Sequence, residues 1–88
     1  MIIENILIED QAKAKILEKH NVTADEIKTI LPGKVLTLKT HSKRYIAVGF
    51  GYRYLTIVFE YENKTVNIIT AYPSSDWQIK LYKSKKER

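Results

Sequence analysis

The sequence contains no cysteine, which excludes a disulfide framework and any thiolate metal site. Its three glycines, Gly33, Gly49 and Gly51, lie at expected turns or strand ends and form no phosphate-binding loop. The two histidines, His20 and His41, are far apart and have no carboxylate at metal-ligand spacing, so we expect no metal site. No serine lies in a nucleophile-elbow pattern. The chemistry that remains is that of lysine, arginine, histidine and tyrosine without a cofactor, or no catalysis at all.

Long hydrophobic runs are also missing, because no stretch approaches the roughly 20 apolar residues of a membrane span. The opening residues MIIENILIED carry acids where a signal peptide would have basic residues. These absences predict a cytoplasmic protein that does not bind membranes. A length of 88 residues, 44% of them hydrophobic, predicts one domain over residues 1–88.

The net charge of +5 is unevenly distributed along the chain. Residues 1–26 hold six acids against three lysines, whereas KLYKSKKER at residues 80–88 holds five basic residues against one acid. A basic tail at about 83–88 is typical of proteins that bind a phosphate backbone or an acidic partner. A solvated tail that only keeps the domain soluble is the alternative.

Two helices are predicted after a short Ile/Leu-rich stretch at residues 2–8, which we expect to form an extra N-terminal strand. Asp10 is expected to cap a helix over 11–20, with Ile16 and Leu17 turned inward. Thr23 and Glu26 fit a capping box for the second helix, and Pro32-Gly33 ends it.

Four strands are predicted next, from their β-branched and aromatic residues, at 34–40, 44–50, 53–61 and 65–72. The connections HSK, GY and ENK are short enough for hairpins, so the sheet is expected to be an antiparallel meander. A last helix follows Pro73, with Ser75 and Gln78 as a second capping box and with Trp77 and Leu81 on its apolar side. The fold class is therefore α+β.

Motifs spread over residues 9–83 resemble those of the BrnT-type toxins, small ribonucleases of toxin–antitoxin pairs that are related in fold to the RelE toxins. The opening pattern of the family matches Asp10, Lys13, Ala14, Lys19, His20 and Glu26. Its RY-x-x-x-G motif is RYIAVG at residues 44–49, and its closing strand and helix match IITA and KLY, the latter ending at Tyr82. The resemblance implies a RelE-like fold and a metal-independent endoribonuclease that acts on mRNA, either free or on the ribosome. It also implies an antitoxin protein as a partner.

Two departures from the family pattern lie near the C-terminus. Tyr72 stands where the family usually has an arginine, and Asp76, Trp77 and Gln78 stand where it has a basic pair followed by a glutamate. The resemblance therefore implies the fold more strongly than it implies cleavage.

RNA cleavage by the 2′-hydroxyl needs a base, a cation for the charge on phosphorus, and an acid for the leaving 5′ oxygen. Arg44 is the expected cation, because a guanidinium can bind two phosphate oxygens at once. Tyr72 can donate a proton or stack on a base, His20 can act as acid or base, and Tyr82 completes the catalytic candidates. The expected RNA-binding residues are Arg53, Lys13, Lys80 and Lys83.

Each candidate also has a plainer interpretation. Tyr72, Trp77, Leu81 and Tyr82 can form a packing cluster that closes the core, and the other candidates can be surface or salt-bridge residues. Two other functions therefore stay open. One is a catalytically inactive RNA- or protein-binding module on the same fold, and the other is a homodimer that pairs through an exposed sheet edge.

Overall fold

The structure is a computed structural model that describes residues 2–86. None of the helices in this range is long and apolar enough to cross a membrane. In chain order the elements are β1 (Asn5–Leu7), α1 (Asp10–His20), α2 (Ala24–Ile30), β2 (Val35–His41), β3 (Arg44–Phe50), β4 (Tyr54–Glu62), β5 (Thr65–Pro73) and α3 (Asp76–Lys86).

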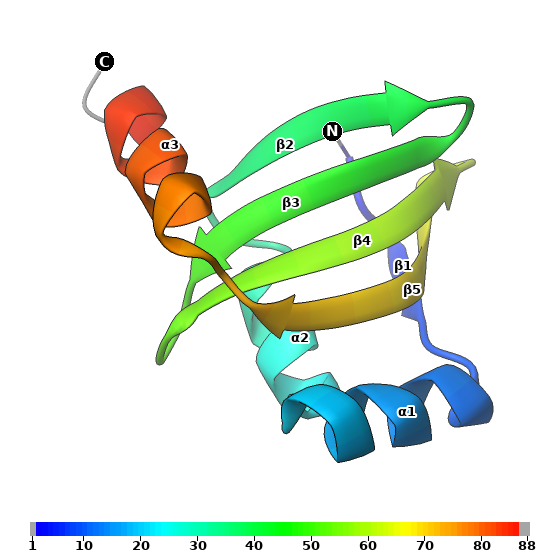
Figure 1. The fold of residues 1–88 in the computed structure, drawn as a ribbon. Helices are drawn as coiled ribbons and strands as arrows, with labels where there is room; N and C mark the ends of the chain where they lie inside the picture. The colour runs from blue at the N-terminus through cyan, green and yellow to red at the C-terminus, as the bar shows by residue number, and fades with distance from the viewer. Residues whose placement is uncertain (1, 87–88) are drawn as a thin grey trace.

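The strands form one five-stranded sheet in the order β1-β5-β4-β3-β2 (Figure 1). Strands β2 to β5 are an antiparallel meander, as the short connections predict. Strand β1 pairs in parallel with the first three residues of β5 only. The predicted α+β class, element order and extra N-terminal strand are thus confirmed.

One face of the sheet carries the hydrophobic core. Leu55, Ile57 and Phe59 alternate along β4 and are completely buried, because α1 and α2 cover this face. Ile16 of α1 and Ile27 of α2 are also buried here, as expected from their helical spacing. The opposite face stays open except where α3 lies across the ends of β2 and β3 (Figure 1).

Two expectations for α1 are wrong. Leu17 is 50% exposed rather than turned inward, because only one narrow side of α1 faces the sheet. Asp10 does not cap the helix, since it is the first helical residue and Glu9 occupies the N-cap position without a side-chain bond. The carboxylate of Asp10 instead lies in the first turn, where the helix dipole favours a negative charge.

Each predicted capping box is half formed. Thr23 Oγ1 accepts a hydrogen bond from the backbone N–H of Glu26 at 3.2 Å, but the Glu26 carboxylate binds Arg53 instead of reaching back. At α3 the returning half is present, since Gln78 Oε1 accepts from the backbone N–H of Ser75 at 2.9 Å.

The prediction that Trp77 packs in a core-closing cluster is wrong, because Trp77 is 63% exposed. Tyr82 is buried and lies edge-on to Tyr54, with ring centroids 5.8 Å apart. Helix α3 therefore packs through the side that carries Gln78 and Tyr82, and the indole of Trp77 stays in solvent. The helix includes residues 83–86 of the predicted basic tail, and residues 87–88 lie outside the described range.

Close packing explains the glycine of the RYIAVG motif. A Cβ atom at Gly49 would lie 2.6 Å from Ile30 Cγ2 and 2.8 Å from Val35 Cγ1, so α2 can approach β3 only over a glycine. At Gly33, by contrast, a Cβ would meet only the carbonyl oxygen of Ile30 at 3.4 Å.

We predict that Gly49→Ala lowers the free energy of unfolding by about 1–3 kcal/mol, because the added methyl group overpacks the contact between α2 and β3. Gly33→Ala is the matched control and should be neutral, since its Cβ has ordinary room and the described glycines have no positive φ. Urea unfolding of both variants measures the difference. Equal losses would show that the close approach at Gly49 does not matter for stability.

Candidate functional site

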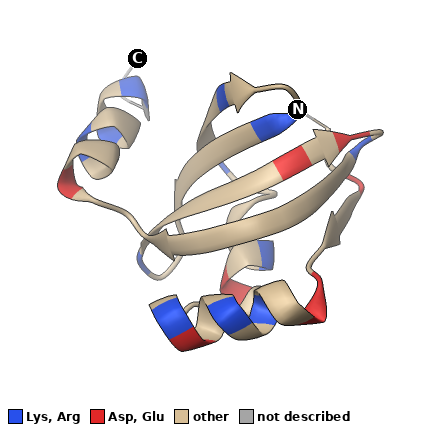
Figure 2. Ribbon diagram, turned by 45° about the vertical axis from the view of Figure 1, so that its right-hand side comes forward, with Lys and Arg blue, Asp and Glu red and all other residues tan. Residues whose placement is uncertain are grey.

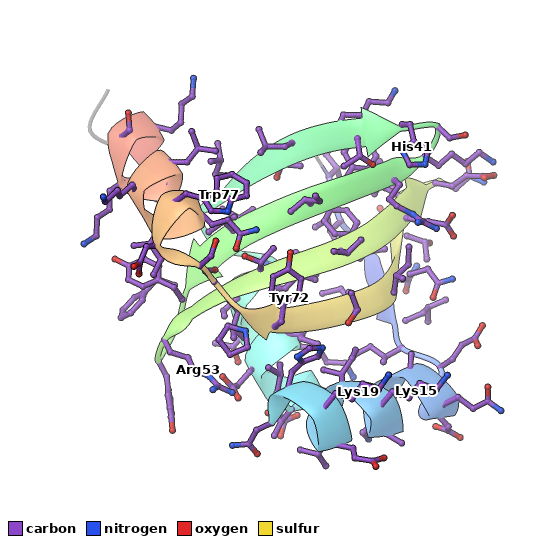
Figure 3. All side chains as sticks on the ribbon, viewed as in Figure 1. Lys15, Lys19, His41, Arg53, Tyr72 and Trp77 are labelled. Carbon is purple, nitrogen blue, oxygen red and sulfur yellow. The ribbon has the colours of Figure 1, made fainter. Side chains whose placement is uncertain are left out.

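Tyr72 lies at the end of β5, on the open face of the sheet. Its register partner on β4 is Thr56. Because β1 pairs with residues 65–67 only, no described strand flanks the outer side of β5 at Tyr72. The side chain is half-buried and rises from this free edge of the sheet (Figure 3).

His20 lies beside Tyr72, although 52 positions separate the two in the sequence. Their ring centroids are 5.9 Å apart, and the ring planes are inclined at 51°. Helix α1 runs along β5 and ends at His20, where Asn21 adopts the left-handed conformation with a φ of 54°. The structure thus brings two of the four predicted catalytic residues together.

Arg53 holds the end of α1 in place. Its Nη2 atom donates to the carbonyl oxygen of Asn21 at 2.6 Å, and both Nε and Nη2 donate to the carboxylate of Glu26 at 3.0 Å. The hydrogen bonds from Arg53 lower the pKa of Glu26 below its ordinary value of 4.5 and raise the pKa of Arg53. Because its guanidinium group is bonded to Glu26 and Asn21, Arg53 serves to fix the junction between α1 and α2, beside His20.

A groove of about 380 Å³ separates α1 from the free part of β5. Lys15, Lys19 and His20 line its helix side, and Thr70 lies on its strand side. Glu9 is the one acid among the lining residues, so the groove is mainly cationic. Figure 2 shows the blue lysine positions along α1, and Figure 3 labels the two that line the groove.

Sequence reasoning missed Lys15 and Lys19 as site residues. It selected Lys13, which is exposed on α1 but does not line the groove. A clue was available in the helical spacing, since residues 15 and 19 are four apart and flank the buried Ile16.

A buried polar network supports Tyr72 from the other side. The Gln78 side chain is 5% exposed, and its Nε2 atom lies 3.3 Å from Tyr72 Oη. Thr56, fully buried, bonds both to Gln78 Oε1 at 2.9 Å and to Ser74 Oγ at 2.8 Å. Among the described residues, no buried side-chain polar atom lacks a partner.

Arg44 lies at the far end of the open face. It pairs in register with Glu60, and its Nη2 is 3.9 Å from the Glu60 carboxylate. Tyr72 pairs with Thr56, four residues away along β4, which amounts to roughly 13 Å of strand at about 3.3 Å per residue. Arg44 and Tyr72 therefore do not meet in one catalytic cluster.

The remaining candidates lie on or under α3. Tyr82 is buried, and its Oη donates to the backbone carbonyl of Lys34 at 3.3 Å. Lys83 places its ammonium group 5.7 Å from the centroid of the Tyr54 ring, and Lys80 is exposed on the helix surface. Lys80 and Lys83 thus form a second basic surface on α3, away from the groove.

No group of three or more metal-binding side chains occurs in the range 2–86. The groove instead brings together an imidazole and two ammonium groups, and the Tyr72 phenol lies beside the imidazole without lining the groove. Such a set of groups can bind an anion and exchange protons with it. A phosphate group fits this combination of charge and hydrogen-bonding capacity.

The architecture is a small α+β fold that a solved ribonuclease toxin shares. In particular, the chain is similar to the crystal structure of the ribonuclease toxin BrnT of Brucella abortus, with a TM-score of 0.68 at 16% sequence identity. The match covers 82% of this chain and 97% of that one. No protein-family profile and no curated protein sequence matches the chain. The fold is thus the BrnT fold, as the sequence resemblance implies.

We predict that Glu26→Gln removes a pH-dependent part of the stability, worth about 1 kcal/mol at neutral pH for a partly exposed pair. Because folding lowers the pKa of Glu26, this stabilisation is present above pH 4.5 and is lost as the pH falls through the folded pKa. Urea unfolding of wild type and variant from pH 7 to pH 3 should show curves that converge in acid.

Glu62→Gln is the control for this measurement, because its ion pair with Lys43 has both side chains more than half exposed. It should change the free energy of unfolding by less than about 0.5 kcal/mol. A constant gap between wild type and Glu26→Gln at every pH would contradict the assignment to the ion pair with Arg53.

Proposed function

We propose that this protein is a toxin-like endoribonuclease of a toxin–antitoxin pair, which cleaves mRNA in the cytoplasm without a metal ion and is neutralised by an antitoxin. The observation that carries the proposal is the contact of Tyr72 with His20, which lines a cationic groove. The BrnT fold supports it, because the similar Brucella abortus protein is a ribonuclease toxin.

In the proposed reaction, neutral His20 takes the proton from a ribose 2′-hydroxyl, and the 2′ oxygen attacks the adjacent phosphorus. Lys15 and Lys19 stabilise the charge that develops on the phosphoryl oxygens. The bond from phosphorus to the 5′ oxygen breaks, and Tyr72 donates its phenolic proton to the leaving oxygen. The products are a 2′,3′-cyclic phosphate and a 5′-hydroxyl end, and proton exchange with water restores both side chains.

The other basic residues are proposed to guide the RNA strand rather than to react with it. Arg44 and the α3 lysines Lys80 and Lys83 are accessible, and they lie away from the groove around the open face of the sheet. Phosphates farther along a bound strand can interact with them. Lys13 would act in the same way from the surface of α1.

The second candidate function is a binding module that keeps the fold and lacks cleavage. It is favoured by Gln78, which stands where the resembling family has a glutamate and which cannot accept a proton as a base. Such a module would bind RNA or a protein partner. A homodimer through β2, which is an edge strand of the sheet, remains a further proposal.

We predict that the purified protein cuts a defined mRNA in EDTA, with or without ribosomes. His20→Gln and Tyr72→Phe should each lower the rate by about 100-fold or more, the usual contribution of a positioned acid or base. Arg44→Gln should lower it by about tenfold or less, the loss expected for one phosphate contact in the bound strand.

Two matched controls separate the site from the general loss of a histidine or a tyrosine. His41→Gln changes an exposed histidine in β2, beside Arg44 in register, and Tyr52→Phe changes a tyrosine that is 79% exposed. Both should cut at the wild-type rate. Intact RNA in every lane would overturn the nuclease proposal and leave the binding module. Cleavage that depends on Arg44 but not on His20 or Tyr72 would contradict the assignment of the active site to His20 and Tyr72.

A further inference from the structure

The hydrogen bonds around Gln78 have a defined direction. Gln78 Oε1 accepts from the backbone N–H of Ser75 at 2.9 Å. Because a backbone N–H can only donate, the amide atom that faces Ser75 must be the oxygen. The Nε2 atom must therefore face Tyr72 Oη, which lies 3.3 Å away.

The same reasoning orients the other members of the network. Thr56 Oγ1 lies 2.9 Å from Gln78 Oε1, an atom that only accepts, so the threonine hydroxyl donates to it. Having used its proton, Thr56 accepts from the hydroxyl of Ser74 at 2.8 Å. Donation thus runs from Ser74 through Thr56 to Gln78, and from the amide of Gln78 to Tyr72.

The end of this chain determines what Tyr72 can do. An amide N–H₂ group donates and does not accept, so Tyr72 Oη is the acceptor in its bond with Gln78. The phenolic proton must consequently point away from Gln78. We propose that Gln78 is a positioning residue that keeps the Tyr72 hydroxyl turned outward as a hydrogen-bond donor to a phosphate oxygen of RNA. This inference rests on the proposed function, since it concerns the same site.

The proposal gives a reason for glutamine at this position. A glutamate would satisfy Ser75 and Thr56 equally well, because both of them donate to Oε1. The difference would be at the atom that faces Tyr72, where glutamate has a second carboxylate oxygen in place of the amide nitrogen. An ionised carboxylate has no proton to donate, so it would accept the proton of Tyr72. The Tyr72 hydroxyl would then turn inward and be lost to a ligand.

The plainer role of Gln78 is structural, because it also caps α3 and fills a buried position. Loss of binding in a single variant would not distinguish the two roles. A Gln78→Glu variant also adds a negative charge, which repels RNA whether or not Tyr72 is involved. A double-mutant cycle with Tyr72→Phe separates these effects, because only an action through the hydroxyl disappears when the hydroxyl is absent.

The probe is a single-stranded RNA oligonucleotide that carries 2′-O-methyl groups throughout, so that it binds without being cut. Binding is followed by the fluorescence of Trp77, the single tryptophan of the chain, which adjoins Gln78 and is largely exposed. Tyr72→Phe and Gln78→Glu should each weaken binding by about tenfold, the loss expected for one hydrogen bond to a charged group. In the Tyr72→Phe background, Gln78→Glu should weaken binding less than it does in the wild type, because only the repulsion by its added charge remains.

A second measurement needs no ligand. In the free protein, NMR of the ring carbon that bears the Tyr72 hydroxyl reports the direction of the bond. Gln78→Glu should move this ¹³C resonance toward the phenolate position, because the hydroxyl then donates to a carboxylate. If Gln78→Glu does not fold, Gln78→Met removes the orienting donor without adding charge, and it should weaken binding by about threefold only when Tyr72 is present.

The outcomes separate this inference from the proposed function. Wild-type binding by Gln78→Glu, or an undiminished effect in the Tyr72→Phe background, would overturn the positioning role alone. Binding that follows the expected cycle, with no cleavage of ordinary mRNA, would uphold the positioning role and overturn the nuclease. Absence of any binding by the wild type would overturn both.

Discussion

The short length of β1 is the constraint on which the site depends. This strand pairs with β5 for three residues only, after which the chain turns into α1 and runs beside the rest of β5. Had β1 continued in the same register, its eighth pair of residues would have covered the edge where Tyr72 lies. Because it ends at Leu7, a helix replaces a strand at this edge and delivers His20 to Tyr72.

The site is supported from both sides by residues that do not take part in the proposed reaction. Arg53 holds the end of α1 through Asn21 and Glu26, and Gln78 holds Tyr72 from α3. These contacts come from the β3–β4 connection and from the last helix, so four separate parts of the chain meet around the pair of rings. The candidate site is therefore a product of the tertiary fold rather than of one local motif.

Periodicity was sufficient to predict the elements of the fold from the sequence. The alternation in β4 and the short hairpin connections predicted the meander correctly, because burial of one sheet face imposes a period of two. Strand register was not predictable in the same way. It puts Arg44 opposite Glu60 and Tyr72 opposite Thr56, at different ends of the open face.

The direction of side chains on the helices was not predicted correctly. Trp77 was expected to pack because it is large and apolar, but the packed side of α3 is occupied by Gln78 and Tyr82.

The central claim is that RNA reacts at the groove, and NMR shift mapping with the 2′-O-methyl oligonucleotide tests it most directly. The account predicts the largest shift changes at His20, Thr70 and Tyr72. Changes confined to the end of the sheet that carries Arg44, with the groove unaffected, would contradict it.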